Sequence, residues 1–421
     1  MKALSTAARF DRAFFADLAD YLVVAVAVML PWSTTITAIC IVAWLVVWLP
    51  ILLMLLLTLS PGTLRRDFLV PAGVLPAVLF VLGLAGMFWA DVSWTERLGG
   101  LDGFAKLLAI PLLLAQFRRS AQGERVIYGF LISTSVVLIV SLISAWRAAP
   151  VVSGKLVGIP AHDDIFQNTE FLLCSFGLFG VAFDQLRRRA KWTPLLCFLL
   201  GLVFLIDIAT VVFSRIALAV IPVLVVLFGW RLLRWRGVFA ACALVAALAV
   251  LAWLAVPNIR SRFDSSLQEM QSYQLSDATT SVGMHAAFLK ESLTIVAAAP
   301  ILGHGTGSIP QQFRQVTAGE SGASGVATVN PHNQTFAVTI QLGVVGALIL
   351  WAMWLAHLLL FRAEGIAAWF GTVVVVENVI SSLFHSHLFD FSNGWLYVFG
   401  TGVLGGTVLG RRGPDDVAPP A

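Results

Sequence analysis

Apolar residues dominate this chain in long runs that recur from one end to the other. A membrane-spanning helix needs roughly 20 mainly apolar residues, and about twelve runs meet that requirement. We expect spans at 17–32, 36–60, 68–90, 101–117, 125–147, 168–186, 193–212, 214–230, 237–256, 333–360, 366–386 and 392–410. Residues 257–333 form the one long polar interval. The pattern therefore predicts an all-α polytopic membrane protein of about twelve transmembrane helices, with one large extramembrane loop containing short helices.

The composition agrees with a membrane protein. Hydrophobic residues make up 59% of the chain and charged residues 12%, and the mean hydropathy is +0.89. A soluble protein carries about twice that share of charge. The four cysteines lie within apolar runs, which favours buried free thiols over disulfides. No spacing typical of a metal site or a nucleotide-binding loop occurs in the sequence, so we expect no metal, no cofactor and no nucleotide.

Lys and Arg residues gather in alternate loops. Clusters lie at 118–119, 187–191, 231–236 and 411–412. Because short loops rich in positive charge stay in the cytoplasm, we expect both termini to be cytoplasmic and the 257–333 loop to face outward. The formal charge of +4 is then a topological signal, and we expect no nucleic-acid partner. We also expect no cleavable signal peptide, since the first apolar run lacks a small-residue cleavage site and another span follows at once.

These patterns divide the chain into four regions. Residues 1–256 hold spans one to nine, and 257–333 form a loop subdomain that carries the active site. Residues 334–410 hold spans ten to twelve, and 411–421 form a disordered cytoplasmic tail, because two Asp and three Pro dominate its composition.

Within the loop, one helix is expected at 282–297. Ser281 is the predicted N-cap, apolar residues recur at helical spacing up to Val296, and Pro300 stops the run. This arrangement places His285 in the first turn, where amides and the helix dipole favour an anion. The glycine-rich segment 303–308 follows. It either brings bare backbone to a phosphate or sugar, or forms a tight turn that needs unusual dihedral angles.

Arg215 is the best placed cation. It opens a predicted span at the outer membrane edge, where a guanidinium can bind two phosphate oxygens together. The alternative is a snorkelling anchor. Asp207, two helical turns earlier, either pairs with Arg215 or is satisfied by a neighbouring helix.

His332 is the best candidate for proton chemistry. It lies between Pro331, which restricts the backbone, and Asn333, which can cap the helix that follows. An imidazole near neutral pKa at the mouth of a membrane cavity suits a general base. The other outer-loop histidines, His162, His385 and His387, either line the same cavity or occupy solvated positions.

These motifs together resemble a known family. Asn330-Pro331-His332-Asn333 running into the Gly343-x-x-Gly346 helix is similar to the signature of the O-antigen ligase and polymerase superfamily, in which a His-Asn pair ends a large periplasmic loop. The segments 281–283 and 300–307 and the Ser214-Arg215 pair are similar to that family's pattern too. The resemblance covers residues 190–410.

The resemblance implies glycan transfer on the periplasmic side of the bacterial inner membrane. The donor would be an undecaprenyl-pyrophosphate-linked glycan, and for a ligase the acceptor would be the lipid A core. Ligase members resemble metal-independent inverting glycosyltransferases. Carried over to this chain, His332 would activate the acceptor hydroxyl, Arg215 would hold the pyrophosphate and Asn333 would lie at the substrate site.

This chain departs from the family at His285, where members commonly have a second arginine. A protonated His285 is one candidate for that phosphate contact. The other candidates are Arg260, Arg262 and Arg314, the remaining arginines of the loop.

Three alternatives to an O-antigen ligase stay open. An O-antigen polymerase would use a second lipid-linked repeat as acceptor, and a protein O-oligosaccharyltransferase would use a protein. A lipid-linked glycan transporter or flippase belongs to a different class. The lack of an evident inverted repeat and the concentration of polar residues in one loop argue against a transporter.

Overall fold

The computed structural model describes residues 2–58, 69–152, 154–212, 214–255 and 257–411, and these residues form helices without any β-strand. The α-helices are α1 (Lys2–Met29), α2 (Thr34–Thr58), α4 (Pro71–Gly86), α5 (Trp94–Ala105), α6 (Ala109–Phe117), α7 (Gly123–Arg147), α8 (Asp164–Arg187), α9 (Thr193–Thr210), α10 (Arg215–Leu233), α11 (Trp235–Ala255), α12 (Pro257–Ser276), α13 (Ser281–Ala298), α14 (Ile309–Val316), α15 (Gln334–Leu360), α16 (Ile366–Ser381) and α17 (Phe391–Arg411). Two short 3-10 helices are η1 (Lys106–Leu108) and η2 (Gly322–Gly325). Beyond Arg411, the predicted tail lies outside the described residues.

Helices long and apolar enough to cross a membrane confirm the predicted fold class. There are seven within the described ranges: Thr34–Met54, Trp94–Phe117, Gly123–Arg147, Asp164–Arg187, Thr193–Thr210, Arg215–Leu233 and Gln334–Leu360. Three shorter apolar helices, Pro71–Gly86, Trp235–Leu251 and Ile366–Ser381, accompany them, and α1 and α17 cover the two remaining predicted spans. The chain is thus an all-α, polytopic membrane protein. The fourth span begins earlier than predicted, because Ser93 and Glu96 form a capping box that starts α5 at Trp94.

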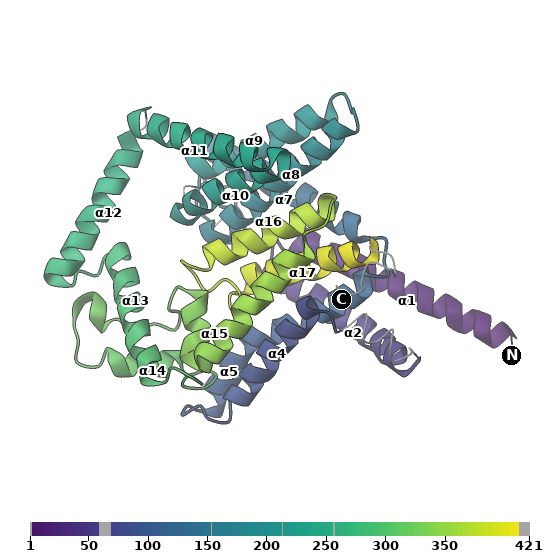
Figure 1. Cartoon of the computed structure of the whole chain (residues 1–421), viewed down its shortest axis with the longest axis horizontal. Coiled ribbons are helices and arrows are strands. Elements are labelled where there is room, and N and C mark those ends of the chain that lie inside the picture. The colour runs from purple at the N-terminus through teal and green to yellow at the C-terminus, as the bar shows by residue number, and fades with distance from the viewer. Residues whose placement is uncertain (1, 59–68, 153, 213, 256, 412–421) are drawn as a thin grey trace.

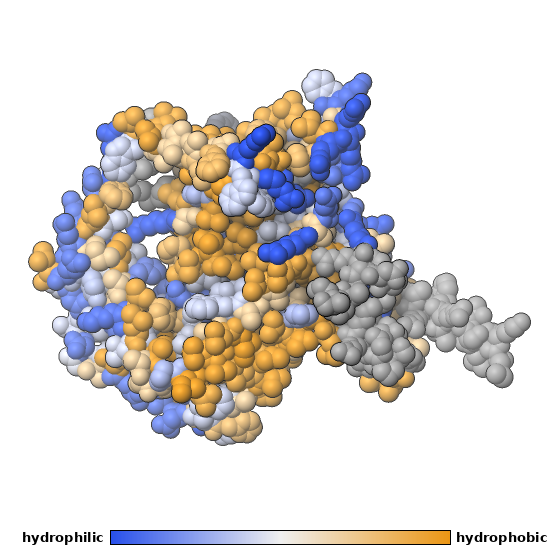
Figure 2. All heavy atoms as spheres, viewed as in Figure 1, coloured by the Kyte–Doolittle hydropathy of each residue, from blue (hydrophilic) through white to orange (hydrophobic). Residues whose placement is uncertain are grey.

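The loops predicted to face outward meet at one end of the bundle. The Nε2 atom of His162 lies 2.9 Å from the carbonyl oxygen of Leu30, and the Lys106 ammonium donates to the Asp390 carbonyl at 2.7 Å. At the other end, Arg411 pairs with Glu124. In Figure 1, α12 to α14 extend on the left of the bundle and the N-terminus lies on the right. Figure 2 shows hydrophilic side chains on the left and at the upper right, with a broad hydrophobic surface between them.

The polar loop contains more helix than the sequence predicts. Helix α13 is found where expected, but its N-cap is Thr280 and not Ser281. The Thr280 backbone is extended, and its hydroxyl accepts a hydrogen bond from the Gly283 amide at 3.1 Å, whereas Ser281 is already helical. The preceding α12 was not predicted, because its apolar residues form no buried stripe; Phe263 and Leu267 are exposed.

Helix α15 is broken at Gly343, and the glycine-rich turn forms hydrogen bonds with the backbone groups that the break leaves unpaired. Gly343 has φ +63° and ψ −166°. This leaves the carbonyls of Ile340 and Gln341 without partners in the helix, and they accept hydrogen bonds at 2.9 Å from the amides of His304 and Gly305. In return, the Val344 amide donates to the Pro300 carbonyl at 2.8 Å. Irregular backbone is tolerated at membrane depth only when its polar groups are satisfied in this way.

The remaining amides of the turn are also engaged. The Thr306 amide donates to the Gly86 carbonyl at 3.1 Å, and the Gly307 amide donates to Oε1 of Gln341 at 2.8 Å. Gly303, Gly305 and Gly307 all have positive φ, and a Cβ atom at Gly305 would lie 2.4 Å from the Cα of Ala90. Of the two readings of this segment, the structure supports a tight turn that clamps the loop to α4 and α15, not a cradle for phosphate.

Candidate active site

His332 is held at the junction between the loop and α15 by its neighbours in sequence. Its amide donates to Oδ1 of Asn330 at 2.9 Å, and its φ is +52°, a value that is rare outside glycine. Asn333 then caps α15 as predicted, since its side-chain oxygen accepts from the Phe336 amide at 3.2 Å. Its Nδ2 also donates to the Leu383 carbonyl at 3.1 Å. Unusual backbone geometry of this kind is concentrated at functional sites.

Four rings from two other segments lie around the His332 imidazole or next to its neighbours. His285 of α13 lies at 5.0 Å between ring centroids, and His385, from the segment between α16 and α17, lies at 5.2 Å. Phe288 stacks on His332, with planes 10° apart and centroids 5.7 Å apart. His387 follows at 5.3 Å from His385. The structure therefore brings together His332, His285, His385 and His387, which the sequence places up to about one hundred residues apart.

Burial holds the His332 imidazole in its neutral form. Removal from water, together with smaller effects of the neighbouring His385 and His285, lowers the pKa of His332 to about 4. Because only the neutral imidazole can accept a proton, His332 is available as a base at neutral pH.

The two flanking histidines have lowered pKa values too. Burial is the largest cause for His285, followed by the charges of His385 and Arg215. Burial also lowers the pKa of His385, while the carboxylates of Asp390 and Asp163 oppose that shift. His285 therefore carries little positive charge at neutral pH.

Arg215 lies near this group as the first residue of α10. The Ser214 hydroxyl caps the helix by accepting from the Ala217 amide at 3.3 Å. Arg215 is exposed, and its charge acts on His285. Among the residues that the structure describes, no hydrogen bond or ion pair engages its guanidinium. The predicted alternatives for Asp207 are resolved: it is fully buried, and its Oδ2 accepts from the Ser141 hydroxyl of α7 at 2.9 Å.

Two of the other candidate cations, Arg260 and Arg314, have structural partners. Arg260 donates to the Trp253 and Leu254 carbonyls at the end of α11. Arg314 pairs with Glu96 at 3.1 Å, which ties α14 to α5. Arg262 lies in α12, and its side chain is outside the part of the chain that the structure describes.

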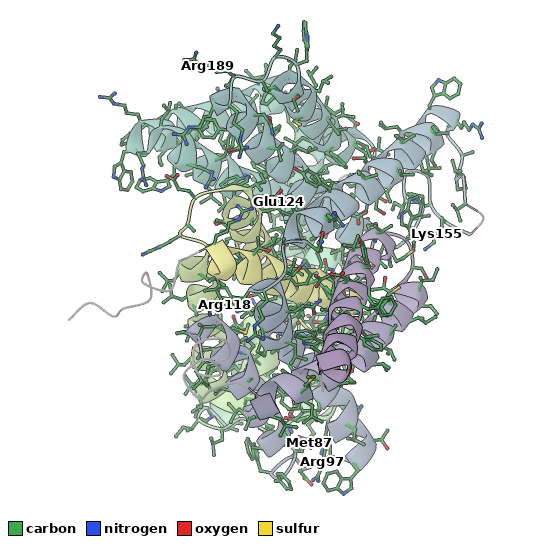
Figure 3. All side chains as sticks on the ribbon, turned by 90° about the vertical axis from the view of Figure 1, so that its right-hand side faces the viewer. Met87, Arg97, Arg118, Glu124, Lys155 and Arg189 are labelled. Carbon is green, nitrogen blue, oxygen red and sulfur yellow. The ribbon has the colours of Figure 1, made fainter. Side chains whose placement is uncertain are left out.

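Arg97 is a further cation with structural partners, and it lies close to the glycine-rich turn. The Arg97 side chain donates to the carbonyls of Met87 and Val92 at 2.8 Å each, closing the connection between α4 and α5 (Figure 3). Arg215 is therefore the guanidinium best placed to bind an anion beside His332.

Phe288 is a site component that the sequence did not single out. Its position fits the apolar pattern of α13, but nothing in that pattern shows that its ring supports an imidazole 44 positions later in the chain. His385 was predicted only as one of several histidines that line the cavity or lie in solvent, and the structure places its ring 5.2 Å from that of His332.

The segment that contains these residues matches a known protein family. Residues 200–351 match the model of a family described as O-antigen ligase. The matched region includes Arg215, His285 and His332 and continues past the break at Gly343. The resemblance inferred from the motifs is thereby confirmed. A search among curated proteins finds no match.

Proposed function

We propose that this chain, whose residues 200–351 match the O-antigen ligase family, is an O-antigen ligase of the bacterial inner membrane. It transfers the glycan of an undecaprenyl-pyrophosphate-linked donor to the lipid A core on the periplasmic side. The observation that carries this proposal is the group formed by His332 and His285, whose rings lie 5.0 Å apart, with the unengaged guanidinium of Arg215 acting on His285. All three residues lie within the matched region.

The proposed reaction needs two contributions from the protein. His332 removes the proton from the acceptor hydroxyl as its oxygen attacks the anomeric carbon of the donor. Arg215 binds the diphosphate that leaves with the electron pair of the broken bond. A fixed guanidinium stabilises this developing charge without reorganisation, and the diphosphate is already a good leaving group, so no nucleotide is required. Attack from the face opposite the leaving group inverts the anomeric configuration.

The position of the site suits substrates that arrive through the membrane. A groove of about 870 Å³ lies between the outer ends of α2 and α17, lined by Thr34, Ala38, Val42 and Phe391 among others. Its lining is almost entirely apolar, which suits a polyprenyl or acyl chain. Phe391 directly follows Asp390, whose carboxylate acts on His385, so the groove and the histidines share the same end of the bundle.

A transfer assay with purified protein tests this proposal. The protein is incubated in detergent or nanodiscs with lipid-linked glycan and rough lipopolysaccharide, with and without a chelator. We expect glycan attached covalently to lipopolysaccharide, and the same yield with the chelator present. Longer lipid-linked chains would identify a polymerase, glycan on added acceptor protein an oligosaccharyltransferase, and movement without covalent transfer a transporter. Any of these three results would contradict the ligase proposal.

A further inference from the structure

The row of imidazoles continues beyond the proposed base into buried polar surroundings. His385 lies 5.2 Å from His332 and 5.3 Å from His387 between ring centroids. His387 is fully buried, and Ser386 is 3% exposed. Among the described residues, Nδ1 of His385, both ring nitrogens of His387 and the Ser386 hydroxyl have no hydrogen-bond partner. Buried polar atoms are nearly always paired with protein or water, so these unpaired atoms are exceptional. The ring nitrogens and the hydroxyl are available to accept and donate protons.

Nearby carboxylates act on the middle ring of the row and not on His332. Asp390 and Asp163 act on His385, whereas the charges that act on His332 are those of His385 and His285. In a Ser-His-Asp triad the carboxylate supports the base directly. Here an imidazole stands between the base and the carboxylates.

The surroundings of the His332 ring disfavour its protonated form. The ring is removed from water by Phe288 and faces two other imidazoles. The charges of Asp390 and Asp163 favour the protonated form of His385, the next ring in the row. A centroid separation of 5.2 Å brings the two rings close enough for transfer directly or through one water.

We propose that His385 receives the proton that His332 takes from the acceptor hydroxyl, so that the two imidazoles form a relay directed toward Asp390 and Asp163. This inference rests on the proposed transfer reaction. The oxygen–hydrogen bond of the acceptor breaks as its oxygen bonds to the anomeric carbon, and the electron pair of the old glycosidic bond stays on the diphosphate. The proton passes from His332 to the neutral nitrogen of His385 and then to solvent, which restores both rings. His385 acts through His332 and is a positioning residue that does not touch substrate.

Substitution of His385 tests the relay. His385→Gln should lower kcat roughly 10- to 100-fold, less than the roughly 10²- to 10⁴-fold expected for loss of a general base. The acid limb of the pH profile should move to higher pH, because the charge of His385 that opposes protonation of His332 is gone. Added imidazole should restore part of the activity of His385→Ala. The control is His304→Gln, since His304 bonds to the Ile295 carbonyl and contacts none of these rings.

Two outcomes would overturn the relay alone. One is His385→Gln with native kcat and a native pH profile. The other is a lower kcat with an unmoved acid limb and no rescue by imidazole, which is the behaviour of a purely structural residue.

A measurement without substrate separates the relay from the proposed function. Histidine ring signals are titrated by NMR in native protein and in His385→Gln, with His332→Gln used for assignment. We expect the His332 pKa to rise in His385→Gln; an unchanged pKa contradicts the coupling on which the relay depends. A native protein that shows this coupling but transfers no glycan would overturn the proposed function and the role of the relay in it, while leaving the coupled pair established.

Discussion

The imidazole of His332 lies flat on the ring of Phe288, with planes 10° apart and ring centroids 5.7 Å apart. Phe288 in turn packs edge-on against Phe313 of α14. Both phenylalanines belong to a small core that also contains Ile295, Ile309 and Ile340. The position and the protonation state of the proposed base therefore depend on the folded loop, and not on the transmembrane bundle alone.

Phe288→Ala should change both the position and the protonation state of His332. Loss of a buried aromatic ring typically costs about 3–5 kcal/mol, and here that loss falls on the loop subdomain. Because burial is the main cause that lowers the pKa of His332, admission of water should raise that pKa and move the acid limb of activity to higher pH. The measurement is kcat against pH. The control is Leu289→Ala, since Leu289 is 50% exposed on the same helix; equal behaviour of the two variants would refute the supporting role of Phe288.

His332→Ala should abolish glycan transfer while the protein remains folded. The side chain is only partly buried and no residue in the described ranges bonds to its ring nitrogens, so its removal leaves no buried group without a partner. The expected loss is about 10²- to 10⁴-fold in kcat, measured beside the elution profile and the thermal midpoint. Turnover near that of the native protein would remove His332 from the role of base.

Gly343→Ala should destabilise the junction between α15 and the loop. Gly343 combines positive φ with extended ψ, a region essentially limited to glycine, and another residue there costs about 1–3 kcal/mol. In addition, the new Cβ would lie 2.0 Å from the Ile301 carbonyl oxygen, so the two segments must separate. The thermal midpoint in detergent should fall and transfer should weaken. Gly99→Ala is the control, because no atom lies within 4 Å of its Cβ position; an equal fall in both variants would show that the break has no special role.

The parts of this structure that follow from local pattern could be predicted, and those that depend on distant partners could not. Long apolar runs identified the spans, and the capping role of Asn333 follows from its own side chain and the helix after it. The glycine-rich turn could be predicted only in part. A tight turn with unusual dihedral angles was one of two predicted alternatives, and the structure favours it because the amides of the turn bond to the carbonyls of Ile340 and Gln341. These become available only because α15 breaks at Gly343.

The candidate site shows the same division. His332 and Arg215 stand out in sequence because of their neighbours and their place at the ends of spans. That His385 contacts His332 depends on how the α16–α17 connection packs on the start of α15, where the Gln334 amide donates to the Ser382 carbonyl at 2.9 Å. Nothing in the local sequence of either segment encodes that contact.

Arg215→Lys should not rescue the loss of activity in Arg215→Ala. The ammonium keeps the charge but lacks the planar fork that binds two phosphate oxygens together. Since the described residues include no partner for this guanidinium, neither substitution should alter folding. The measurement is kcat and the KM for the donor in both variants. Arg314→Lys is a useful comparison, because Arg314 is paired with Glu96. Recovery of most of the activity by lysine at position 215 would indicate an interfacial anchor or a diffuse positive charge.

His285→Arg should strengthen donor binding at neutral pH. In the native protein, burial and the charges of His385 and Arg215 lower the pKa of His285. Its positive charge is therefore lost as the pH rises through this lowered pKa, which lies below the usual range for histidine. A guanidinium at this position early in α13 keeps its charge across this range and can bind two phosphate oxygens together. The KM for the donor should therefore fall, and its dependence on pH should flatten.

The same substitution should also change the acid limb of the pH profile of kcat. A permanent charge beside His332, whose ring lies 5.0 Å from that of His285, should lower the pKa of His332 further. Because His332 works in its neutral form, the acid limb of kcat should move to lower pH. His285→Gln is the control, since it removes the imidazole without adding charge and should move that limb to higher pH. A folded His285→Arg protein with unchanged donor KM would show that this position does not contact the phosphates, and that the second cation must be sought at Arg260, Arg262 or Arg314.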